Sequence, residues 1–177
     1  MITQYKTVTA LLVSLLTLSS NAEAIELPES ITVAGTELPL IASATRRELW
    51  VDVYECGIYG VGSEPDIELV DDGPVVVEFR VTTDLLPDDP PAVWRETLKP
   101  ALSSSAYRAL TAGFAELDEN EYLEFFYSPA KGTTVFVDGE KLFASNGDEL
   151  IRAILALLVG PDPASAGLKS ELLSAES

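Results

Sequence analysis

The residue types needed for most nucleophilic and metal chemistry are missing from the sequence. The 177-residue chain has no histidine and a single cysteine, Cys56. Without histidine, neither a Ser-His-Asp nor a Cys-His nucleophile can be assembled, and zinc or copper has no imidazole ligand. One cysteine can form neither an intrachain disulfide nor a thiolate cluster. The sequence therefore predicts no metal and no other cofactor, and arginine is left as the residue best suited to hold a ligand.

Arg46 is the strongest candidate for a binding residue. It directly precedes an extended run, residues 47–59. This run has apolar side chains on both faces and should therefore be covered on both sides. A guanidinium in such a place needs an anionic or hydrogen-bonding partner, because an unpaired buried charge is very costly. A carboxylate fits best, since it accepts two parallel hydrogen bonds. That carboxylate is either a ligand's or an internal Asp or Glu, and Arg47 should point the opposite way.

Two aromatic residues of the same run are candidate partners of Arg46 in a ligand site. Tyr54 could donate a phenol hydrogen bond to the ligand, although strand tyrosines also serve as core or rim packing. Trp50 is expected on the same face as Tyr54, where it would line a cleft or fill the core. Cys56 has no histidine to activate it and no disulfide partner, so we expect a small buried apolar side chain.

The first 24 residues have the pattern of an export signal. Lys6 supplies a positive charge, residues 9–18 form an apolar stretch, and residues 22–24 (Ala-Glu-Ala) fit the small-x-small rule of signal peptidase. The stretch is shorter than the roughly 20 residues that cross a bilayer, which makes a retained membrane anchor the less favoured alternative. We expect residues 1–24 to be a cleaved signal peptide and residues 25–177 to form a single domain, periplasmic or secreted and not membrane-spanning.

Charge and composition exclude further classes of protein. Asp and Glu number 29 against 11 Lys and Arg, which gives a net charge of −18. Nucleic-acid binding is excluded because phosphate neutralisation needs a basic face. With 47% apolar residues the chain should nevertheless fold. The clustered acidic residues are best interpreted as a solvated surface that keeps the protein soluble.

The spacing of apolar residues predicts strands at both ends of a helical middle. Asp138-Gly139 suits the type I′ turn of a tight hairpin. Residues 153–159 have no polar face, so their helix should pack against a sheet on one side and other elements on the other. The result is an α+β protein with a mainly antiparallel sheet and helices on one face. The expected strands are residues 31–33, 37–38, 47–59, 74–82, 122–127, 133–137 and 140–143, and the expected helices are residues 93–114 (broken at Pro100), 146–159 and 164–173.

Four segments occur in an order that points to one family. Residues 42–59 read ASATRRELWVDVYECGIY, residues 127–133 read YSPAKGT, residues 157–160 read LLVG and residues 164–169 read ASAGLK. Together they resemble the chalcone isomerase-like family, in which a Gly-Ala-Gly-x-Arg turn leads into a strand ending in Gly-(Leu/Val/Ile)-Tyr. The similarity covers nearly the whole expected domain, and the exported bacterial branch of the family fits best.

The resemblance implies an open-faced β-sandwich, a large antiparallel sheet covered on one face by helices with a ligand cleft between them. In plant chalcone isomerases an arginine in that cleft stabilises a developing enolate, and non-catalytic members use the same arginine for a fatty-acid carboxylate. It matches Arg46. The family's strand threonine falls at Tyr54 and its late-helix threonine at Leu157, while Tyr107 is the candidate for its helix tyrosine.

Three functions remain open. The favoured one is a non-catalytic binding protein for a fatty-acid-like or other apolar carboxylate, with Arg46 as the anion anchor and Tyr54, Trp50 and Tyr107 as further ligand-binding residues. The second is an isomerase or intramolecular lyase, which would need a base and an ordered water network that the sequence does not show. The third is an interaction module for another envelope protein, whose cleft is merely core.

Overall fold

The structure is a computed structural model that describes residues 27–33 and 35–174; the expected signal peptide lies outside the described residues. Its elements in chain order are β1 (Ser30–Val33), β2 (Thr36–Glu48), β3 (Val51–Gly60), α1 (Leu69–Asp72), β4 (Val75–Val81), α2 (Ala92–Ala101), α3 (Ser104–Ala115), β5 (Tyr122–Ser128), β6 (Gly132–Val137), β7 (Glu140–Ser145), α4 (Glu149–Val159) and α5 (Ala166–Ser174).

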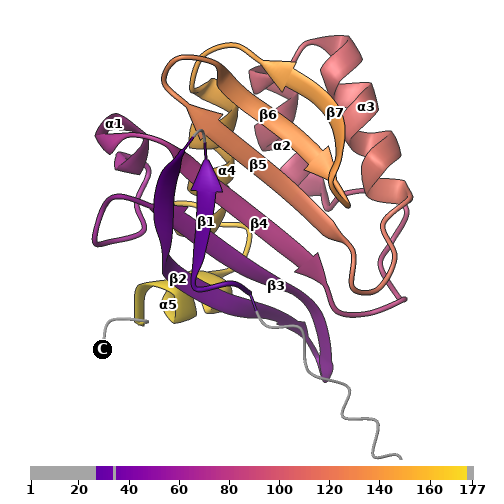
Figure 1. Ribbon diagram of the computed structural model, residues 1–177. Helices are drawn as coiled ribbons and strands as arrows, with labels where there is room; N and C mark the ends of the chain where they lie inside the picture. The colour runs from indigo at the N-terminus through magenta and orange to yellow at the C-terminus, as the bar shows by residue number, and fades with distance from the viewer. Residues whose placement is uncertain (1–26, 34, 175–177) are drawn as a thin grey trace, which may run out of the picture.

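The strands form one antiparallel sheet in which each pairs with its neighbour in sequence, from β1 to β7. Helices α2, α3 and α4 lie together behind this sheet in Figure 1, and β1 crosses its front. On that front face Ile31 and Val33 of β1 pack against a small buried group formed by Leu38, Tyr59 and Val76. The predicted α+β open-faced β-sandwich, with a large antiparallel sheet and helices on one face, is confirmed.

Helix α4 forms the centre of the main core, as its sequence predicts. Seven of its residues are buried: Leu150, Ile151, Ile154, Leu155, Leu157, Leu158 and Val159. The helix contacts β4 of the sheet on one side and α2 and α5 on the others. A helix enclosed by other elements in this way is apolar on its buried faces, because those faces do not contact water.

The expected strand at residues 47–59 is wrong, because it is interrupted by a hairpin turn. Strand β2 ends at Glu48 and β3 begins at Val51, with Leu49 and Trp50 as the two-residue connection. Leu49 has a φ of 56°, in the left-handed region. Tight hairpins need such angles, and glycine or asparagine normally supplies them; a leucine there costs roughly 1–2 kcal/mol. The sequence thus carries none of the usual turn residues at this bend.

The hairpin also corrects the expected position of Arg46. This residue lies near the end of a 13-residue strand, β2, rather than at the start of a strand. Much of β2 was not expected to be a strand, because residues 39–45 (Pro-Leu-Ile-Ala-Ser-Ala-Thr) lack the alternation of apolar and polar residues that marks one. Pairing with β3 through the register nevertheless makes the segment extended.

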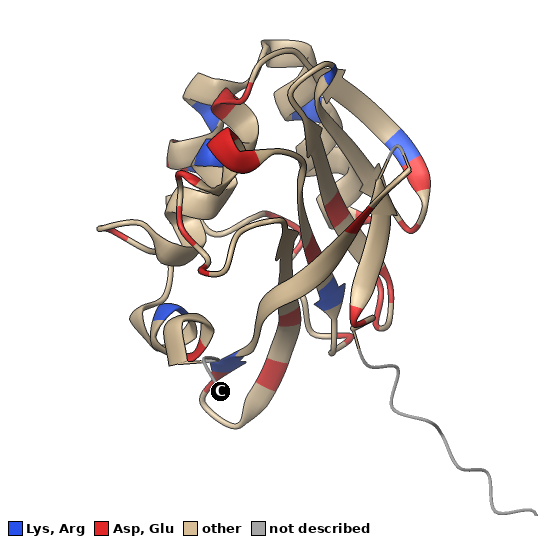
Figure 2. Cartoon of the chain, turned by 60° about the vertical axis from the view of Figure 1, so that its left-hand side comes forward, with Lys and Arg blue, Asp and Glu red and all other residues tan. Residues whose placement is uncertain are grey.

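Acidic residues are spread over the outside of the molecule. Figure 2 shows them on strands, helices and loops, with the fewer basic residues scattered among them. Across the described part of the chain, no helix has the length and apolar character needed to cross a membrane.

Candidate functional site

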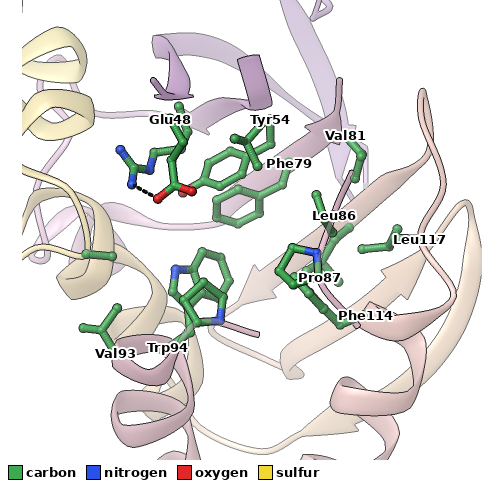
Figure 3. Close-up of a pocket in the computed structure, with 15 residues that line it drawn as sticks. Glu48, Tyr54, Phe79, Val81, Leu86, Pro87, Val93, Trp94, Phe114 and Leu117 are labelled. Carbon is green, nitrogen blue, oxygen red and sulfur yellow. Dashed lines mark hydrogen bonds and ion pairs between the residues drawn. The ribbon is translucent and has the colours of Figure 1, made fainter. Parts of the chain in front are cut away.

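A cavity of about 140 Å³ lies between the sheet and the helical layer. Its walls come from strands β2 to β5, from the loop between β4 and α2, from α2 and α3, and from the segments that follow α3 and precede α5. Apolar side chains make up most of the lining, and the polar ones are Arg46, Glu48 and Tyr54. Figure 3 shows Glu48, Tyr54 and Phe79 on one side of this space, with Leu86, Pro87 and Phe114 across from them.

Arg46 lies at the edge of this cavity, with 28% of its side chain exposed. Its Nη1 donates to the carbonyl oxygen of Arg47 at 2.9 Å and to Oγ of Ser165 at 3.3 Å. Its Nη2 donates to Oε1 of Glu48 at 2.9 Å. A guanidinium has five N–H groups. Among the described residues, the N–H on Nε and one on Nη2 have no partner, so Arg46 keeps donors for a further acceptor.

Tyr54 lies directly across from Arg46 in the register of β2 and β3. On one continuous strand, at about 3.3 Å per residue, the two residues would lie roughly 26 Å apart. Cross-strand neighbours have Cβ atoms only about 5 Å apart. The unexpected hairpin therefore brings together the two residues that the sequence proposed separately. Both line the cavity.

The ring of Tyr54 belongs to an aromatic cluster that forms one wall of the cavity. It meets Phe79 edge-on, with ring centroids 5.5 Å apart, and Trp94 at 6.5 Å. Phe79 and Trp94 also meet each other, at 5.1 Å. Burial raises the pKa of the Tyr54 phenol above its usual value, more strongly than the nearby Arg46 lowers it. The phenol therefore stays protonated and keeps its O–H for donation to an acceptor.

Two of the proposed ligand-binding residues do not lie in this cavity. Trp50, expected to line a cleft or fill the core, is 85% exposed at the tip of the β2–β3 hairpin. Tyr107 lies on α3 and is not among the residues that line the cavity. Leu157, where the family's late-helix threonine falls, is buried in α4 and is likewise absent from the lining.

Arg47, which was expected to point the opposite way from Arg46, is not among the residues that line the cavity, and its side chain pairs with Asp52 at 2.8 Å. Cys56 is fully buried in the main core, in agreement with the sequence. Burial also raises the pKa of its thiol, so the group remains neutral. Neither side chain lines the cavity, although the backbone carbonyl of Arg47 accepts from Arg46.

Several cavity residues were not foreseen as site residues. Glu48 falls within the expected strand at residues 47–59, where the sequence gives no sign of the turn that follows it. Phe79 and Trp94 fall within the expected strand at residues 74–82 and the expected helix at residues 93–114, and the sequence assigned neither a role in a site. Leu86 and Pro87 belong to a loop for which the sequence gives no contact. The alternation of β4 could have placed Phe79 beside Tyr54, had the β3–β4 register been known.

Comparison with known proteins supports the architecture. A sequence model of the chalcone isomerase-like family matches residues 19–174. No curated protein matches the chain. The crystal structure of a fatty-acid binding protein from Arabidopsis thaliana is similar, with a TM-score of 0.54 and 16% sequence identity, over 83% of this chain and 90% of that chain. At that level of identity the likeness shows a shared fold.

The sheet, the helical layer and the cavity between them define an open-faced β-sandwich protein with an internal pocket. The family match covers nearly all of the described residues, and the chain belongs to the chalcone isomerase-like family. The family suggested by the sequence motifs is thereby confirmed, while its exported bacterial branch stays a prediction.

Proposed function

We propose that the protein binds a small apolar molecule with a carboxylate group, such as a fatty acid, and that Arg46 holds the carboxylate. The observation that carries this proposal is the position of Arg46. It borders an apolar cavity and keeps two N–H groups without a partner among the described residues. Arginine binds carboxylates through paired, charge-assisted hydrogen bonds, and Tyr54 opposite can donate a third.

The comparisons support the same class of ligand. The Arabidopsis protein with this fold is a fatty-acid binding protein. In the present chain the apolar lining would hold the hydrocarbon part of such a ligand, and the aromatic wall of Tyr54, Phe79 and Trp94 would pack against it.

The size of the cavity limits which part of the ligand it can hold. At about 140 Å³ it is close to the volume that accommodates one benzene ring, and it is below the roughly 300 Å³ at which ligand pockets usually begin. The carboxylate end and a short apolar segment fit this space. A longer chain would need the loop at residues 82–91, which supplies Leu86 and Pro87 to the lining, to move outward.

Isothermal titration of the purified protein with octanoate, dodecanoate and hexadecanoate tests the proposal, with the methyl ester of the best ligand as the uncharged comparison. The acid should bind more tightly than the ester. Arg46→Gln should weaken binding of the acid by at least about tenfold, the equivalent of roughly 1.4 kcal/mol, and leave ester binding unchanged.

Arg47→Gln is the matched control, because it removes the same charge from the adjacent residue on the other face. It should leave both affinities unchanged. Equal binding of acid and ester by the wild-type protein would refute the anchoring role of Arg46. No binding of any acid would favour the interaction module.

We also propose that the protein acts outside the cytoplasm, on the strength of the N-terminal export pattern. Mass spectrometry of protein recovered from its native cells should give an N-terminus at Ile25. An intact N-terminus would contradict the predicted cleavage.

A further inference from the structure

The tip of the β2–β3 hairpin exposes two large apolar side chains side by side. Leu49 is 89% exposed and Trp50 is 85% exposed, the two highest values among the large apolar residues of the described chain. Large apolar side chains are ordinarily buried, and Trp50 was expected to line a cleft or fill the core. Their exposure therefore needs an explanation outside the packing of the fold.

Folding does not explain the choice of Leu49. Its φ of 56° lies in the left-handed region, which glycine or asparagine adopts with less strain. A leucine at this position makes the turn less favourable and buries none of its own surface. Residues that break a local preference in this way tend to serve function.

The base of the hairpin is electrically balanced, although the whole chain has a net charge of −18. Arg46 pairs with Glu48 at 2.9 Å, and Arg47 pairs with Asp52 at 2.8 Å. Two positive and two negative charges thus cancel just behind the apolar tip. These four side chains therefore add no net charge when the tip approaches an apolar surface.

The tip adjoins the cavity. Arg46 and Glu48, which precede it directly, both line the cavity. Leu85 is 72% exposed on the loop after β4, and the next residue, Leu86, is also part of the lining. Exposed apolar side chains therefore flank the cavity on two separate segments of the chain.

We propose that the hairpin tip, Leu49 and Trp50, inserts into the interface of a lipid bilayer with neutral headgroups. A tryptophan buries about 150–250 Å² in a contact, so one tryptophan and one leucine fall well short of the roughly 800 Å² per partner of a stable protein complex. Insertion into lipid needs no complementary surface, and tryptophan favours the headgroup region of bilayers. The contact would also place the cavity where apolar carboxylates partition. This consequence, unlike the contact itself, rests on the proposed function.

The chain offers a direct reporter of this contact, because its two tryptophans lie in different places. Trp50 is at the tip, whereas Trp94 is 6% exposed in the cavity wall. The test uses two single-tryptophan variants, Trp94→Phe and Trp50→Phe, mixed with vesicles of brominated phosphatidylcholine. Emission from Trp50 should shift to shorter wavelength and be quenched at least twofold, whereas emission from Trp94 should not be quenched.

Leu49→Asn tests the contribution of the tip, since asparagine tolerates the left-handed turn and removes the apolar surface. It should lower the vesicle partition constant at least fivefold. Val61→Thr is the matched control, because Val61 is also exposed but follows the opposite end of β3; its partition constant should change less than twofold.

Vesicles rich in phosphatidylglycerol should bind more weakly at low salt, because Asp84, Asp88 and Asp89 lie on the Leu85 loop.

The outcomes separate this inference from the proposed function. Unquenched Trp50 emission, or equal partition of wild type and Leu49→Asn, would overturn the lipid contact and leave the tip to a protein partner. If the protein binds carboxylates but does not bind vesicles, the lipid contact is refuted and the proposed function stands. Vesicle binding through Trp50 without any carboxylate binding would support the contact and refute the proposed ligand.

Discussion

At the scale of single residues, Glu48 is the carboxylate that pairs with the guanidinium we propose as the anchor of the ligand. Glu48 accepts from Nη2 of Arg46, and its own side chain is 68% exposed. An ion pair with so exposed a partner contributes little to stability, about 0–1 kcal/mol. A carboxylate held in the apolar cavity would be better shielded from water and so more strongly bound. The pair therefore resembles a resting arrangement that a ligand can displace.

Glu48→Gln should for this reason tighten the binding of a fatty acid, by roughly threefold, because the competing negative charge is removed. Calorimetric titration of wild type and variant would measure the change. Asp52→Asn is the matched control, since it frees Arg47 on the other face and should leave the affinity unchanged. Weaker binding in Glu48→Gln would show that Glu48 orients Arg46 rather than competing for it.

At the scale of the elements, strand β4 carries a buried carboxyl group on the face opposite the helices. Glu78 is 4% exposed and lies directly across from Glu124 of β5. Beside it, Glu55 of β3 pairs with Arg80 of β4 at 2.8 Å. Burial, followed by the charges of Glu124 and Glu55, raises the pKa of Glu78 from 4.5 to about 7, against the opposing effect of Arg80.

This raised pKa predicts how stability changes with pH. Between about pH 4.5 and about 7 the folded state keeps the Glu78 proton and the unfolded state loses it, so the free energy of unfolding should fall as pH rises. Glu78→Gln should flatten this fall and stabilise the protein at pH 8 by roughly 1–3 kcal/mol. Urea unfolding at a series of pH values measures both effects. Glu119→Gln, at an exposed site, is the control and should change neither the pH dependence nor the stability at pH 8. An unchanged pH profile in Glu78→Gln would show that Glu78 is not the source of the pH dependence.

The turn between β5 and β6 depends on a glycine for two reasons. Gly132 has a φ of 73°, and a Cβ added there would overlap the carbonyl oxygen of Ser145. Gly132→Ala should therefore lower the free energy of unfolding by roughly 2–4 kcal/mol. Gly139→Ala is the control, since Gly139 has a similar φ of 77° with no atom within 4 Å of an added Cβ; its cost should be about 1 kcal/mol. Equal losses in denaturant unfolding would refute the steric part of the argument.

At the scale of the whole molecule, the net charge of −18 opposes the compact state through repulsion among surface carboxylates. Screening should relieve this repulsion, so raising NaCl from about 20 mM to about 500 mM should raise the Tm by at least about 4 °C. Choline chloride should act equally well if screening is the cause. A larger effect of NaCl would indicate specific sodium binding instead.

Much of the architecture was predictable because the relevant interactions are local. The apolar run of α4 predicts a helix buried on all sides, whatever surrounds it. Asp138-Gly139 specifies its hairpin through backbone preferences of two residues, and both have positive φ. The spacing of apolar residues predicted the order of the elements, and the family resemblance then implied the open-faced sandwich into which they pack.

The sequence by itself determined the α+β class, the buried helix and the candidacy of Arg46 and Tyr54 as site residues. Only the tertiary structure decided that these two side chains lie opposite each other and that Trp50 leaves the site. The reason is the bend at Leu49, where strand pairing imposes a left-handed backbone on a residue that does not favour it. Local preferences at Leu49 disfavour the left-handed region, and long-range pairing of β2 with β3 overrides them.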